Sequence, residues 1–265
     1  MISEDRKKYL RDIKTRKITI TFFQIAIFLI FVILWEVLGD MELIDTFITS
    51  QPSRIFDTLI NLTSNNLLMH IVVTTYETLI GFFLGTLLGT FIAIILWWSD
   101  YLSAIFEPYL VVLNSLPKVA LGPIIIIWVG AGTSAIIVMA IAISLVVTIL
   151  ENLNGFIKTD KELIKMAKTF NASKFQILTK IVIPANLNTF INSLKVNIGL
   201  SLVGVISGEF LVSKAGLGYL IVYGGQVFKL DLVMTSVLIL GVLAGIMYGS
   251  VLVLEKIILK RRLKI

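Results

Sequence analysis

The stretch Leu232–Leu254 contains no Asp, Glu, Lys or Arg. A helix needs about 20 consecutive apolar residues to cross a bilayer core, so this stretch predicts a membrane span. The rest of the chain agrees, because 57% of the 265 residues are hydrophobic and only 15% are charged. Soluble domains carry about 25% charged residues. The sequence therefore argues against a soluble enzyme and against a disordered protein.

Five other apolar runs predict further spans: Ile18–Leu38, Leu79–Trp98, Phe106–Val129, Ser134–Leu150 and Val196–Val212. The fifth run extends backwards through the more polar stretch Leu187–Lys195. Together the six runs predict an all-α membrane protein with six spanning helices and little room for a soluble domain.

Basic residues gather in three segments and set the predicted orientation. Of the 23 Lys and Arg, seven lie in residues 1–17, six in 155–185 and five in 255–265. With six spans these segments share one side, which is cytoplasmic by the positive-inside rule. We therefore predict a basic cytoplasmic N-terminus (1–17), a six-helix membrane domain (18–258) with a cytoplasmic loop at 155–185, and a basic cytoplasmic C-terminus (259–265). The net charge of +6 is then a topology signal and not a nucleic-acid footprint.

No pattern in the chain indicates catalysis or a resident metal. Cys is absent and His occurs once. Phosphate-binding, serine-hydrolase and zinc-protease motifs are absent from the sequence. An intramembrane hydrolase is a remote alternative, since Ser207 would need the distant His70 as its base. A membrane scaffold without transport activity is another.

Two spans carry a glycine at every fourth position: Gly81, Gly85 and Gly89, then Gly241, Gly245 and Gly249. Such spacing lets a second helix approach closely. The expectation is packing within the chain, with a dimer contact or a moving contact as the alternative.

The third span is unusually polar, since Asn114, Ser115 and Lys118 surround the helix-breaking Pro117. Polar groups at membrane depth normally face protein or water. Lys118 therefore either lines a water-filled translocation route or reaches the membrane–water interface. In the fifth span, Asn197 is too polar for a lipid-facing position, and Glu209 is expected to pair with a cation or to accept backbone hydrogen bonds.

The basic loop between spans four and five predicts a short amphipathic helix over 160–170, a turn and a second helix. Leu163, Met166, Ala167 and Phe170 recur at helical spacing. The element either docks a cytoplasmic partner or rests on the membrane surface.

This loop resembles the EAA loop of permease subunits in ABC importers. The family spacing is present in Lys165–Met166–Ala167, then Asn171, then Ile181–Val182–Ile183–Pro184. Lys165 replaces the usual Glu and Asn171 the usual Gly. Asn tolerates a left-handed turn better than most residues, so the turn can persist. The resemblance implies ATPase-coupling residues: Lys165, Met166, Ala167, Phe170, Asn171, Ala172 and Pro184.

Other segments are similar to the nitrate, sulfonate and taurine branch of the family: Pro52–Ser53–Arg54, Leu116–Pro117–Lys118–Val119–Ala120, Gly208–Glu209–Phe210–Leu211 and Gly216–Leu217–Gly218–Tyr219–Leu220–Ile221. The resemblance implies the type I permease fold and a prokaryotic cell-membrane location. It also implies a homodimer in membrane lipid, two copies of an ATPase that binds ATP and Mg, and an external solute-binding protein. No cofactor is expected in this chain.

The substrate expected from the resemblance is a small anion such as nitrate, a sulfonate or taurine. The alternative is another small organic solute, such as a vitamin precursor. The expected pathway residues are Asn114, Ser115, Lys118, Asn197 and Glu209.

Overall fold

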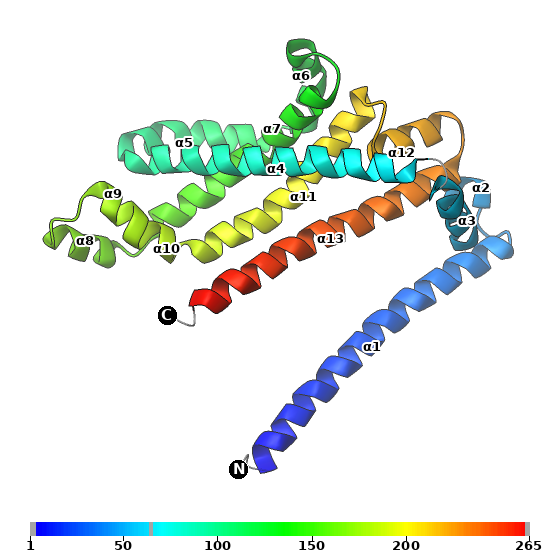
Figure 1. Cartoon of the computed structure of the whole chain (residues 1–265), viewed down its shortest axis with the longest axis horizontal. Helices are drawn as coiled ribbons and strands as arrows, with labels where there is room; N and C mark the ends of the chain where they lie inside the picture. The colour runs from blue at the N-terminus through cyan, green and yellow to red at the C-terminus, as the bar shows by residue number, and fades with distance from the viewer. Residues whose placement is uncertain (1–3, 64–65, 263–265) are drawn as a thin grey trace.

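The described part of the computed structural model, residues 4–63 and 66–262, is built from helices (Figure 1). The α-helices are α1 (Glu4–Asp40), α2 (Thr46–Thr49), α3 (Pro52–Thr63), α4 (Leu67–Trp98), α5 (Asp100–Ser115), α6 (Gly122–Val129), α7 (Thr133–Ile157), α8 (Lys161–Thr169), α9 (Lys174–Ile177), α10 (Ile183–Ala185), α11 (Leu187–Val212), α12 (Leu217–Gln226) and α13 (Leu230–Arg262). A 3₁₀ turn (Lys118–Leu121) precedes α6, and a π-helical turn (Leu178–Val182) follows α9. The outermost residues of the predicted basic termini, 1–3 and 263–265, lie outside the described residues.

Five helices are each long and apolar enough to cross a membrane: α1, α4, α7, α11 and α13. The remaining predicted span, the third along the chain, is bent by 88° between α5 and the segment Lys118–Val129. Pro117 sits at this bend and lacks the backbone N–H that a continuous helix would use. The predicted all-α fold is therefore confirmed, and the third span is a broken one.

The second span begins at Leu67, well before the predicted Leu79. The added segment contains Thr74, Glu77 and Thr78, which are polar but fully buried. Because these side chains face other helices and not lipid, hydropathy alone placed the start of the helix too late.

Helices α4, α7 and α11 pack together as the core of the bundle. A Cβ added at Gly81 would lie 2.5 Å from Ala140 Cβ of α7, and one at Gly204 of α11 would lie 2.5 Å from the Ala140 Cα. The first glycine row thus serves packing within the chain, as expected. The second row, on α13, faces open space, because an added Cβ at Gly241, Gly245 or Gly249 would meet nothing within 4 Å.

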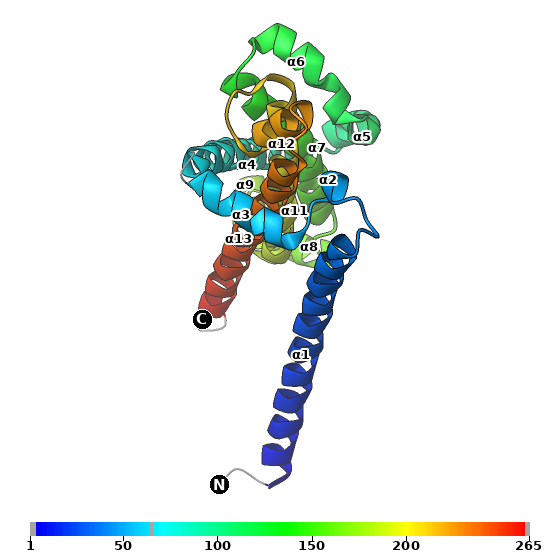
Figure 2. The same ribbon diagram turned by 90° about the vertical axis from the view of Figure 1, so that its right-hand side faces the viewer.

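Helix α1 stands apart from this core in both views (Figures 1 and 2). None of its most apolar 18-residue window is buried within the chain. Its C-terminal end is held by polar contacts, since Trp35 Nε1 donates to the Ser50 carbonyl and the Glu36 carboxylate accepts from the Ser53 N–H. The rest of the helix is therefore available to lipid or to another chain.

Candidate functional site: the loop between α7 and α11 and the broken span

The loop between α7 and α11 folds as two short helical segments joined by a tight turn. Asp160 caps α8 by accepting a hydrogen bond from the Glu162 N–H at 2.8 Å. Helix α8 ends at Thr169, and Asn171 two residues later is left-handed, with a φ of +56°. Ser173 and Gln176 then form a reciprocal capping box that starts α9. The left-handed turn expected at Asn171 is present, although the residue is not glycine.

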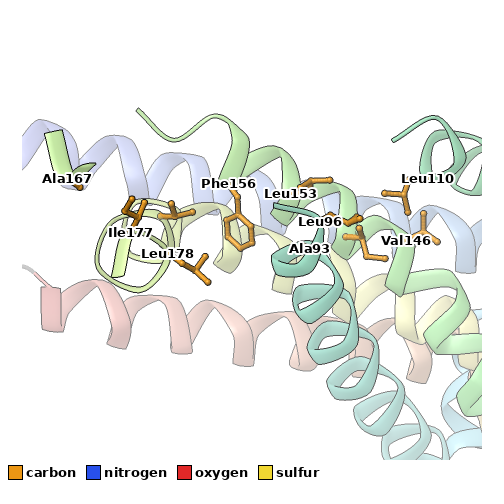
Figure 3. Packing of buried hydrophobic residues seen from close by; sticks show 11 residues of the cluster. Ala93, Leu96, Leu110, Val146, Leu153, Phe156, Ala167, Ile177 and Leu178 are labelled. Atoms are coloured by element: carbon orange, nitrogen blue, oxygen red, sulfur yellow. The ribbon is translucent and has the colours of Figure 1, made fainter. Parts of the chain in front are cut away.

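One face of α8 holds the loop against the membrane helices (Figure 3). Ala167 is only 8% exposed and belongs to a buried cluster with Ile177 and Leu178 of the loop and Phe156 of α7. The cluster continues along α7 and into α4 through Leu96. Burial of this apolar surface stabilises the contact between the loop and the spans.

The large apolar side chains of α8 and of Phe170, which directly follows it, are exposed. Phe170 is 79% exposed and Met166 is 53% exposed, and Leu163 is also exposed. The four apolar positions predicted for one face are thus divided, because Ala167 turns inward while the other three remain outside. Lys165 and Asn171 are exposed as well, whereas Ala172 and Pro184 are half-buried.

Three of the predicted pathway residues meet at the break in the third span. Asn114 and Ser115 end α5, and Lys118 begins the 3₁₀ turn. Lys118 Nζ donates to the Asn114 carbonyl at 3.2 Å and to Asn114 Oδ1 at 3.3 Å. The ammonium therefore supplies a donor to a carbonyl in the last turn of α5, where the helix stops and its own backbone donors end.

Asn197 lies elsewhere, in the centre of the α4, α7 and α11 core. It is fully buried, and its amide donates to the hydroxyls of Thr148 and Thr86. These bonds join all three core helices at one point, away from the break.

Glu209 lies at the far end of α11 and organises the segment that leads into α12. Its carboxylate accepts from Thr74 Oγ1 at 2.6 Å and from the Gly218 N–H at 2.5 Å. Of the two expected roles, accepting backbone hydrogen bonds is the one observed. A Cβ at Gly216 would collide with this carboxylate, which explains the glycine there.

Sequence reasoning undervalued two neighbours of Glu209. His70 Nδ1 accepts from the Gly216 N–H at 3.0 Å, so it is a structural acceptor for the segment before α12. Ser207 instead donates to the Val203 carbonyl. Glu77 is buried beside Glu209, and its oxygens have no partner of hydrogen-bonding geometry among the described residues. The sequence did contain a sign that Glu77 is buried. The spacing of Thr74, Glu77 and Thr78 places three polar side chains on one face of an otherwise apolar helix.

Comparison with known proteins identifies the class. The family model for the inner membrane component of binding-protein-dependent transport systems matches residues 85–264. The chain belongs to this family, the permease subunits of ABC importers.

Two relatives and one solved structure show how similar the chain is to known permeases in sequence and in fold. The aliphatic sulfonates transport permease protein SsuC of Bacillus subtilis is 26% identical, over 88% of this chain and 85% of that protein. The formylaminopyrimidine transport permease protein ThiX of Halalkalibacterium halodurans is 24% identical, over 89% of this chain and 94% of that protein. An inward-facing structure of the MetNI methionine ABC transporter has a TM-score of 0.63 at 18% identity and covers 70% of this chain and 92% of that one. The structural match supports the same fold.

Proposed function

We propose that this chain is the permease subunit of an importer for a small anion, working as a homodimer with two ATPase copies inside and a solute-binding protein outside. ATP and Mg²⁺ would be bound by the ATPase, since this chain carries no phosphate-binding loop. Both termini and the α8–α10 loop would lie in the cytoplasm, where the basic residues gather.

The exposed face formed by Leu163, Met166 and Phe170 is the observation that carries this proposal. Three large apolar side chains are left exposed on a polar loop, outside the buried cluster through which Ala167 packs towards α7. An exposed apolar row at helical spacing favours insertion into a groove of a partner. A push on α8 by the ATPase would pass through Ala167, Ile177 and Phe156 into α7.

The test is a charge placed on the exposed face. Met166→Asp should greatly reduce recovery of the ATPase and abolish uptake, because burying an unpaired carboxylate at the interface costs several kcal/mol. The chain itself should still insert, since Met166 is exposed in it. The matched control is Thr179→Asp, an exposed residue of the same loop outside the α8 face. ATPase recovery equal to wild type in Met166→Asp would mean that the face rests on lipid.

A sulfonate or similar anion is the favoured substrate because Lys118 supplies a cation at the break in the third span. The likeness to SsuC supports that class. The likeness to ThiX favours a vitamin precursor as the second candidate. The test is the uptake of labelled taurine in the presence of an excess of an unlabelled sulfonate or of formylaminopyrimidine. Competition by the sulfonate alone supports the first class of substrate, and competition by formylaminopyrimidine supports the second.

A further inference from the structure

A cleft of about 760 Å³ lies between the α8–α10 loop and the membrane helices. Segments from distant parts of the sequence form it: the junction of α4 with α5, the end of α7, and the loop helices α8 and α9. It adjoins the buried cluster shown in Figure 3. The exposed residues Leu163, Met166 and Phe170 do not line it. The cleft and the proposed ATPase-docking face are therefore different sides of α8.

The loop side of the cleft is strongly cationic. Lys161, Lys165 and Lys168 project from one face of α8, and Lys174 follows at the start of α9. Asp100 and Glu107 of α5 line the opposite side. Among the residues that the structure describes, none of these six side chains takes part in an ion pair. The lysines are thus left with charge to offer an anion.

The remainder of the cleft is apolar and lies at the end of a membrane span. Leu96, Trp97, Phe156, Ile164 and Ile177 contribute to its lining. Trp97 and Trp98 end α4, and tryptophan is enriched where a span meets the headgroup layer.

Lys174 is fixed at this level. Its Nζ donates to the Trp98 carbonyl at 2.5 Å and lies 6.0 Å from the centroids of both tryptophan rings. The cleft therefore combines cations with an apolar floor at the height of the headgroups.

We propose that this cleft binds the headgroup of an anionic phospholipid from the cytoplasmic leaflet. The phosphate lies against the lysines of α8, away from Asp100 and Glu107, which repel it. The upper part of an acyl chain covers the apolar floor. Basic residues at the surface attract anionic lipids, and several acting together give selectivity over neutral ones. The proposal rests on the cytoplasmic orientation given above and places α8 between lipid on one side and the ATPase on the other.

The experiment is a lipid titration of the purified permease–ATPase complex, delipidated in detergent. Phosphatidylglycerol or phosphatidylcholine is added, and native mass spectrometry counts the lipid bound to this chain. The variant is Lys161→Gln/Lys165→Gln/Lys168→Gln, which removes three cleft charges while keeping good helix formers. The control is Lys158→Gln/Lys180→Gln/Lys256→Gln, which removes the same charge from exposed lysines that do not line the cleft.

Phosphatidylglycerol should bind about tenfold more weakly to the cleft variant, while the control stays within about twofold of wild type. Phosphatidylcholine binding should be the same in all three proteins. Equal phosphatidylglycerol binding in the two variants would overturn the proposal. So would loss of the ATPase from the cleft variant without a change in lipid binding, which would make the cleft a protein contact. Failure of the wild-type chain to recover an ATPase would contradict the proposed function and not the lipid site. The lipid bound to the permease alone could still be counted in that case.

Discussion

Lys118 is the residue on which the proposed substrate class depends. Its ammonium is held by Asn114 at the break, where both side chains are at least partly accessible. An anion approaching the break would find a cation whose hydrogen-bonding capacity is partly free, since an ammonium has three donors and two are directed at Asn114.

Lys118→Met keeps the length of the side chain and removes its charge. Uptake of an anionic solute in proteoliposomes should fall at least about tenfold, equivalent to about 1.4 kcal/mol. Recovery of the ATPase should not change, because the α8–α10 loop, the proposed docking element, is untouched. Lys214→Met, which removes an exposed cation just after α11, is the control. Wild-type uptake by the Lys118 variant would remove Lys118 from the pathway.

Asn171 carries a second prediction at this scale. Its φ of +56° is a left-handed conformation that costs a residue with a Cβ about 1–2 kcal/mol, and Asn less than most. Asn171→Gly should therefore leave the thermal stability of the complex unchanged or raise it. Asn171→Val should lower the stability and speed proteolysis of the loop. Equal protease sensitivity of the Gly and Val variants would show that the turn does not govern the order of the loop.

Among the helices, close packing of α11 on α7 offers the sharpest test. A Cβ at Gly204 would meet the Ala140 backbone, which cannot rotate away as a side chain can. Gly204→Ala should cost about 1–3 kcal/mol through overpacking and lower the melting temperature in detergent. Gly199→Ala, on the same helix with nothing within 4 Å of the new methyl, should not destabilise. A similar melting temperature for both variants would contradict the packing described here.

The helices also show how much of the fold could be predicted from the sequence alone. The apolar runs, the break at Pro117, the amphipathic α8 and the turn at Asn171 were all predictable, because each depends on neighbouring residues. The early start of α4 was not, since Thr74 and Glu77 find their surroundings in α11 and in the segment before α12. The inward side of Ala167 was not predictable either, because Ile177 and Phe156 decide it by covering that side.

For the candidate site the limit is the same. The local pattern brought Asn114, Ser115 and Lys118 together correctly, but it could not separate them from Asn197, whose partners lie on α4 and α7. The cleft behind α8 was missed because its lysines face α5, more than fifty residues away in sequence.

For the whole molecule, the six-crossing topology predicts which side each loop occupies. The chain has no native Cys, so single cysteines report cleanly. Lys14→Cys and Lys180→Cys should resist a membrane-impermeant maleimide in intact cells, whereas Met41→Cys and Lys214→Cys should react. All four positions are exposed in the chain, so lack of reaction reports the membrane and not burial. Labelling at Lys14 or Lys180 in sealed cells would exclude this topology.

The glycine contact between α4 and α7 bears on the mechanics of the transport cycle. The row from Gly81 to Gly89 is seated against Ala140, Ser144 and Thr148, so α4 and α7 are in close contact at three successive turns. Helix α7 is 25 residues long, a rod of about 37 Å at 1.5 Å per residue. A displacement imposed at the Ile157 end of α7 is therefore delivered to its Thr133 end with little lost to compression. Bending during the transport cycle is therefore expected at the connections between helices, above all in the few residues on either side of Pro117.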